Sequence, residues 1–124
     1  MNKRILLIED NEQNRYLVAY LLQARGWKVA HAEDGPAGLK LAAEIGPALI
    51  LLDIQLPGMD GYAVARALRE NPKLDAIPVV AVTSYAMAGD RERCMEAGCN
   101  GYIEKPIDPQ RFAAQVESFL ERPA

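Results

Sequence analysis

Residues 48–61 read ALILLDIQLPGMDG. Five apolar residues in a row, ALILL, run directly into the carboxylate of Asp53. An unbroken apolar run of this length is typical of a strand that is covered on both faces, as in a parallel sheet. The Pro and the two Gly behind Asp53 are typical of a loop. The stretch therefore predicts a buried strand that ends on an acid, beside an open loop.

Four further segments are predicted as strands, with longer segments of helical periodicity between them. The strand segments are KRILLI at 3–8, WKVAH at 27–31, IPVVAV at 77–82 and GYIE at 101–104. Strand and helix thus alternate five times, and parallel strands joined by helices need right-handed crossovers with helices on both faces. We therefore expect a doubly wound α/β fold, a (βα)5 unit around a five-stranded parallel sheet with the flavodoxin-like strand order 2-1-3-4-5.

Helix boundaries are predicted from Gly, Asp and Pro. Gly26, Gly46 and Gly98 each follow a helical pattern, at the place where a left-handed residue ends a helix and Gly avoids a Cβ clash. Asp108 is predicted to cap the last helix, with Pro109 at its first position, where a missing N–H does no harm.

Length and composition restrict the class of protein. We expect one domain over residues 1–124, since 124 residues form one ordinary core. The 14 basic and 17 acidic residues give a net charge of −3, which argues against nucleic acid as a partner. No apolar run approaches the roughly 20 residues that cross a bilayer, so no membrane association is expected. Cys94 and Cys99 have no zinc-site spacing, and we expect a reducing, cytoplasmic location.

Polar residues follow four of the five predicted strands. They are Glu9 and Asp10, Asp53, Thr83 and Ser84, and Lys105. In a doubly wound fold the ligand site lies beyond the carboxyl ends of the strands, so these side chains are expected to meet. Three carboxylates and one Lys give a local charge of −2, and oxygen ligands without Cys or His favour Mg²⁺, with Mn²⁺ as a substitute. A carboxylate beside such a metal, an ammonium group and a hydroxyl is suited to accept a phosphoryl group.

These residues closely resemble the receiver domain of bacterial response regulators, over about residues 3–120. The resemblance is carried by LLIEDN, by LILLDIQLPGMDG around Asp53, by VVAVTS and by GYIEKPI. Among subtypes the chain looks most like stand-alone DivK-type regulators and the receivers of hybrid kinases. The resemblance implies that Asp53 is phosphorylated by a phosphohistidine of a sensor histidine kinase or histidine phosphotransferase. It also implies that the protein is a signalling switch in a phosphorelay and catalyses only its own modification and slow dephosphorylation.

The resemblance also assigns roles to the remaining residues. Asp10 and Asp53 would hold Mg²⁺ directly with the backbone carbonyl of Gln55, and Glu9 would act through water. Lys105 would bind the phosphoryl oxygens. Thr83 would move toward the phosphate and Tyr102 would follow, which changes the partner-binding face of the fourth helix, fifth strand and fifth helix.

Three details near the site complete the expectations from the resemblance. The bond before Pro106 is expected to be cis. Ser84 stands where the family usually has Ala or Gly, and its larger side chain could narrow access to the site. Gln55 and Tyr85 occupy positions that tune how long the phosphoryl group persists.

Three other functions compete with the switch. A phosphohydrolase of the haloacid dehalogenase type would carry a second Asp two residues after the nucleophile, where this chain has Gln55. A flavin or nucleotide binder would need a phosphate-binding loop rich in Gly, Ser or Thr after the first strand, where this chain has the acidic EDNEQN. An inert scaffold of the same fold would not need the acceptor, the metal acids, the hydroxyl and the Lys together.

Overall fold

A computed structural model of the protein describes residues 2–84 and 89–120. The strands are β1 (Arg4–Ile8), β2 (Lys28–Ala32), β3 (Leu49–Asp53), β4 (Val79–Thr83) and β5 (Gly101–Glu104). The helices are α1 (Glu12–Gln23), α2 (Gly35–Ile45), α3 (Gly61–Glu70), α4 (Asp90–Ala97) and α5 (Phe112–Ser118). The strands pair in parallel in the order β2-β1-β3-β4-β5, so the predicted fold class and strand order are confirmed.

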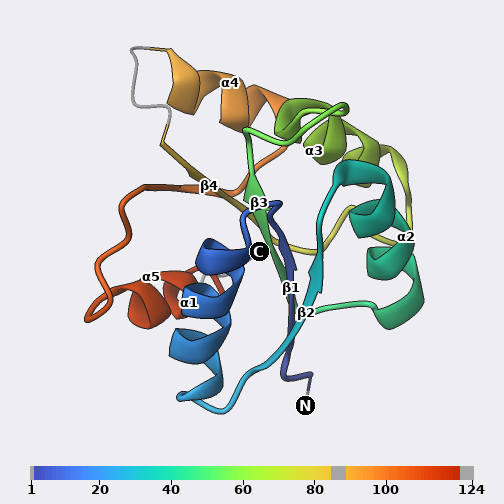
Figure 1. Ribbon diagram of the computed structural model, residues 1–124. Coiled ribbons are helices and arrows are strands. Elements are labelled where there is room, and N and C mark those ends of the chain that lie inside the picture. Colours follow the sequence, from blue (N-terminus) through green and yellow to red (C-terminus); the bar gives the residue numbers. More distant parts are fainter. Residues whose placement is uncertain (1, 85–88, 121–124) are drawn as a thin grey trace.

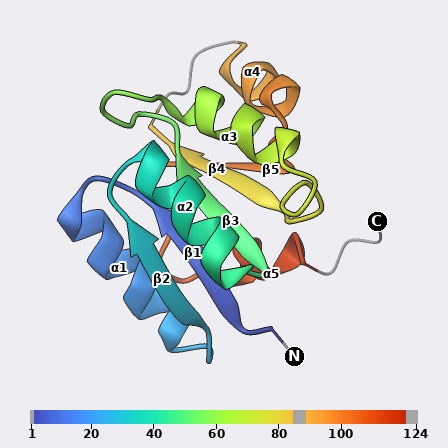
Figure 2. The same ribbon diagram turned by 90° about the vertical axis from the view of Figure 1, so that its right-hand side faces the viewer.

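The sheet is covered on both faces, which is why its central strands are apolar throughout. Alternate residues of β3 point to opposite sides: Leu49 and Leu51 pack with α1 and α5, whereas Ile50 and Leu52 pack with α2, α3 and α4. Figures 1 and 2 show these two helical layers on either side of the sheet. All residues of β3 and β4 are buried.

The predicted Gly residues end three helices. Gly46 and Gly98 directly follow α2 and α4 with left-handed φ values of 55° and 112°. After α1, one more turn leads to Gly26, whose φ is 91°. There the N–H of Gly26 donates to Gln23 and that of Trp27 to Leu22, which satisfies the last carbonyls of the helix.

The predicted start of the last helix is wrong. The Asp108 side chain does accept a backbone hydrogen bond, from Gln110 at 2.9 Å, but it closes a turn over residues 108–111. Helix α5 begins only at Phe112, after Arg111. A short polar side chain can cap a turn as readily as a helix, so the Asp-Pro pair marked a turn here.

Arg69 links two connections at the amino ends of β4 and β5, the end of the sheet opposite to the acids. Its guanidinium donates to the carbonyls of Asp75, Ile77 and Gly98 at 2.8–3.0 Å, and to the side chain of Asn100 at 2.7 Å. These acceptors belong to the loop before β4 and to the turn after α4. One side chain on α3 thus joins two connections that are far apart in the sequence.

A second network joins α5 to the segment before β2. The indole N–H of Trp27 donates to Glu117 at 3.0 Å, and Arg25 forms an ion pair with the same carboxylate. The ammonium group of Lys3 lies 4.7 Å from the centre of the Trp27 ring, at cation–π distance.

Cys94 and Cys99 are free and buried, as small apolar residues would be.

Candidate functional site

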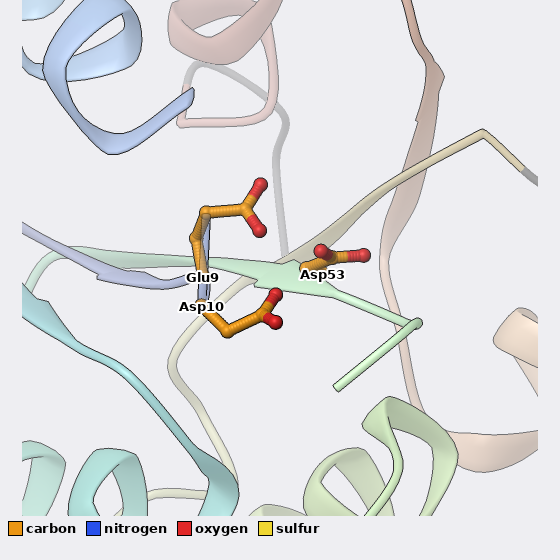
Figure 3. Close-up of side chains that lie close together, drawn as sticks. All are labelled: Glu9, Asp10 and Asp53. Carbon is orange, nitrogen blue, oxygen red and sulfur yellow. The ribbon is translucent and has the colours of Figure 1, made fainter. Parts of the chain in front are cut away.

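Three carboxylates converge at the carboxyl edge of the sheet. Glu9 follows β1 and Asp53 ends β3, and the register pair Ile8 and Leu52 just before them brings the two acids to matching positions on neighbouring strands. Asp10 is exposed beside them, whereas Glu9 and Asp53 are only 3% and 4% exposed. One carboxylate oxygen from each residue lies within 4.8 Å of the others, and Figure 3 shows the three side chains grouped together.

Lys105 brings the compensating charge. It follows β5, and its backbone N–H donates to the carbonyl of Thr83 at 2.9 Å, which fixes the start of the loop against β4. Its ammonium nitrogen lies 2.7 Å from Oε1 of Glu9 and 3.3 Å from Oδ2 of Asp53. The bond between Lys105 and Pro106 is cis, as expected. The three acids and the Lys that were predicted at the strand ends therefore all lie together at the carboxyl edge of the sheet.

The electrostatics of the cluster follow from burial and from the surplus of acids. Burial, and then a hydrogen bond with Asp53, raise the pKa of Glu9 to about 7, against a smaller opposing effect of Lys105. Burial alone would lower the pKa of Lys105, but its hydrogen bond with Glu9 and the charge of Asp53 raise it overall. A divalent cation with oxygen ligands would relieve the repulsion between the negatively charged carboxylates. The three carboxylates have the donor chemistry that Mg²⁺ prefers.

Two residues near Asp53 form the opening of the site. The backbone N–H of Gln55 donates to Oδ1 of Asp53 at 2.9 Å. Its side-chain oxygen accepts a hydrogen bond from the hydroxyl of Ser84, which follows β4. Both residues line an open cavity of about 530 Å³ together with Asp10, Asp53 and Lys105. Tyr85, the other residue expected to flank the site, lies outside the described residues.

By strand alternation, the side chains of Thr83 and Tyr102 belong to the face of the sheet opposite to that of Asp53. Asp53 continues the row of Leu49 and Leu51, whose side chains face α1 and α5. Thr83 is 1% exposed and continues the row of Val79 and Ala81, which face α3 and α4. Tyr102 is half-buried and packs against that second core. The two residues thus share the face of the sheet that α3 and α4 cover.

Arg15 belongs to the site and was not predicted. From the first turns of α1 its guanidinium donates to the backbone carbonyls of Glu9 and Asp10, at 2.9 and 3.0 Å, and it forms an ion pair with Glu33 at 3.3 Å. It therefore fixes the backbone that carries the acidic pair. The available signal was a single Arg near the start of the helix that follows two acids.

Comparisons with known sequences identify the family of the chain. The profile of the response regulator receiver domain matches residues 5–117. The polar-differentiation response regulator DivK of Brucella ovis is 43% identical over 120 residues, which are 97% of this chain and 98% of DivK.

Solved structures share the fold of the chain. The receiver domain of a sensor histidine kinase from Pseudomonas aeruginosa PAO1, which has a magnesium ion coordinated in its active site cleft, superposes with a TM-score of 0.89 at 31% identity and covers 98% of this chain and 100% of its own. The signal receiver domain of a histidine kinase from Syntrophus aciditrophicus has a TM-score of 0.87 at 30% identity, over 98% of this chain and 95% of its own. Among the described residues, no helix is both long and apolar enough to span a membrane.

Proposed function

The chain belongs to the response regulator receiver domain family of two-component systems, and on this premise we propose that Asp53 accepts a phosphoryl group in a Mg²⁺-dependent reaction. The donor is a phosphohistidine on a sensor histidine kinase or histidine phosphotransferase. The observation that carries the proposal is the meeting of Glu9, Asp10, Asp53 and Lys105 at one edge of the sheet. Under this proposal residues 1–124 form one receiver domain that acts in the cytoplasm, where the kinase presents its phosphohistidine.

The proposed metal site uses the acids that the fold gathers. Asp10 and Asp53 would hold Mg²⁺ directly together with the backbone carbonyl of Gln55, and Glu9 would act through water. When bound, Mg²⁺ neutralises negative charge on the carboxylates and on the incoming phosphoryl oxygens. The oxygen-only donor set and the 4.8 Å spacing of the carboxylate oxygens support this assignment.

Asp53 acts as the nucleophile. A carboxylate oxygen of Asp53 forms a bond to phosphorus while the bond between phosphorus and the histidine nitrogen breaks, and the leaving imidazole takes the electron pair and is then protonated. The backbone N–H of Gln55 prepares Asp53 for this step, because it holds one of the two carboxylate oxygens in place. Its other oxygen is the one near Lys105.

Lys105 and Thr83 would bind the transferred group. The ammonium group of Lys105 already bonds to Glu9 and Asp53, so a small movement brings it to a phosphoryl oxygen as the negative charge shifts outward. The Thr83 hydroxyl, at the end of the next strand, would donate to a second oxygen. The protein would therefore be a switch that modifies itself and slowly loses the modification, rather than an enzyme that turns over substrate.

The response to phosphorylation would reach the partner-binding face through Thr83 and Tyr102. Thr83 ends β4, and both residues belong to the side of the sheet that α4 covers. A movement of Thr83 toward the phosphoryl group would change the packing beside Tyr102. The downstream protein partner would then bind the face formed by α4, β5 and α5.

Intact-mass spectrometry tests the proposed function directly. The protein is incubated with Mg²⁺ and phosphoramidate, a small donor with the same nitrogen–phosphorus bond as phosphohistidine. We expect the wild type to gain one phosphoryl group, and Asp53→Asn to gain none. Asp75→Asn is the matched control, since Asp75 is exposed and lies at the opposite edge of the sheet, before β4. Equal labelling of Asp53→Asn and the wild type would contradict the assigned acceptor.

A further inference from the structure

A hydrogen bond between two side chains crosses the opening of the carboxylate site. The hydroxyl of Ser84 donates to the side-chain oxygen of Gln55. Asp53 pairs with Val82 across β3 and β4, so Gln55 and Ser84 each lie two residues beyond this register pair. The Ser84–Gln55 bond thus continues the pairing of two neighbouring strands past the end of their backbone ladder.

This bond holds the side chain of Gln55, an exposed residue that lines the cavity beside Asp53. The backbone of Gln55 is held by its N–H bond to Oδ1 of Asp53, at 2.9 Å. Its side chain is held by Ser84, from a different strand. The bond directs the oxygen of the Gln55 carboxamide toward Ser84, and both residues line the cavity that contains Asp53 and Lys105.

We propose that Ser84 is a positioning residue that slows the loss of the phosphoryl group from Asp53 by holding the side-chain oxygen of Gln55. The inference rests on the proposed function, and it concerns the lifetime of Asp53 in its modified form. A side-chain amide oxygen near a phosphoryl group can accept a hydrogen bond from water and direct that water at phosphorus. The Ser84 hydroxyl keeps this oxygen turned to β4, and the amide N–H groups are left as donors for phosphoryl oxygens.

The step that Ser84 slows is hydrolysis. The oxygen of a water molecule forms a bond to phosphorus while the bond between phosphorus and the Asp53 oxygen breaks. The electron pair returns to the Asp53 carboxylate, one proton of the water passes to solvent, and inorganic phosphate leaves. An oriented water accelerates this step because its approach is already in line with the bond that breaks.

The test measures how fast the phosphoryl group is lost in the wild type and in four variants: Ser84→Ala, Ser84→Thr, Gln55→Met and the double variant Ser84→Ala/Gln55→Met. Each protein is labelled with phosphoramidate and Mg²⁺, the donor is removed, and the remaining label is followed by intact mass. We expect Ser84→Ala to increase the rate of loss about fivefold, the equivalent of one hydrogen bond of about 1 kcal/mol. The same substitution should have no effect in the Gln55→Met background. Ser84→Thr keeps the hydroxyl and should lose the phosphoryl group at the wild-type rate.

A second measurement examines the bond in the unmodified protein. In ¹⁵N-correlated NMR spectra, the side-chain amide signals of Gln55 should shift in Ser84→Ala and keep their positions in Ser84→Thr. An unchanged or lower rate of loss in Ser84→Ala, an equal acceleration in the Gln55→Met background, or unmoved amide signals would overturn the inference. A wild-type protein that takes no label would overturn the proposed function itself, so the two failures are distinguishable.

Discussion

The ammonium nitrogen of Lys105 lies closer to Glu9 than to Asp53, at 2.7 Å against 3.3 Å. Both acids are nearly buried, and this one cation contacts both of them. In the protein without metal, the stronger contact of Lys105 is therefore with the acid that is not the proposed acceptor. The charges of Glu9 and Lys105 should therefore affect both the stability of the protein and its affinity for Mg²⁺.

The stability of the metal-free protein should depend on the protonation of Glu9. Its pKa is raised from 4.5 to about 7, so between these values the folded state binds more protons than the unfolded state. The free energy of unfolding should therefore fall as the pH rises through this interval, by at most about 3 kcal/mol, and then level off. The raised pKa of Lys105 affects stability only at pH values above 10.5.

Urea unfolding in the presence of a chelator checks this, in steps from about pH 5 to about pH 8. Glu9→Gln should flatten the profile, because the amide does not titrate. Glu70→Gln, an exposed acid on α3, should leave the profile as in the wild type. A wild-type profile that rises across the interval would contradict the assignment of the buried proton to Glu9.

Magnesium affinity should separate the roles of the acids. We expect Asp10→Asn to weaken binding more than about tenfold, and Glu9→Gln to weaken it by about tenfold, as for a group that acts through water. Affinity should also fall below about pH 7 in the wild type, since protonated Glu9 no longer attracts the ion. Isothermal titration calorimetry measures both effects. Asp34→Asn is the control, because Asn still caps α2; equal affinities in all variants would place the metal elsewhere.

Removal of the Lys105 charge should destabilise the metal-free protein. Lys105→Met keeps the aliphatic length but leaves Glu9 and Asp53 without their shared cation, and we expect a loss of about 1–3 kcal/mol in the free energy of unfolding. Added Mg²⁺ should recover most of this loss by replacing the missing positive charge. Chemical unfolding with and without Mg²⁺ provides the comparison, and Lys73→Met, at an exposed site, is the control. A loss that Mg²⁺ does not reduce would show that the Lys105 stem, rather than its charge, is what matters.

Arg69 should contribute more to stability than a surface Arg. Arg69→Ala removes the side-chain donor of three backbone carbonyls and leaves Asn100 Oδ1 with only the N–H of Val79, and we expect a loss of about 2–4 kcal/mol. Arg69→Lys should recover only part of it, because one ammonium group cannot reach acceptors on both connections. Arg66→Ala, on the exposed side of the same helix, should change the free energy of unfolding by less than about 0.5 kcal/mol. Similar losses for Arg66→Ala and Arg69→Ala would contradict the role of the network.

The sequence was sufficient for features that depend on local chemistry. The apolar runs located all five strands to within two residues, and the polar residue after each run located the acids and Lys105. The start of α5 was missed because the side chain of Asp108 can cap a turn or a helix, and the sequence around it does not distinguish the two.

Contacts between distant segments could not be predicted in this way. Arg69 bonds to Gly98, and Arg25 forms an ion pair with Glu117. These partners are too far apart in the sequence for hydrophobic periodicity to predict the contacts. The bond between Ser84 and Gln55 likewise depends on the register of β3 against β4, which becomes known only when the sheet is assembled.

Trp27 is the only tryptophan of the chain, and it lies just before β2, at the opposite end of the sheet from Asp53. A five-residue strand is about 17 Å long, so the indole is well removed from any ion or phosphoryl group bound among the acids. Its indole N–H donates to Glu117 on α5 instead. We therefore expect the fluorescence of Trp27 to report unfolding and to stay constant while ligands are titrated at the other end of the sheet.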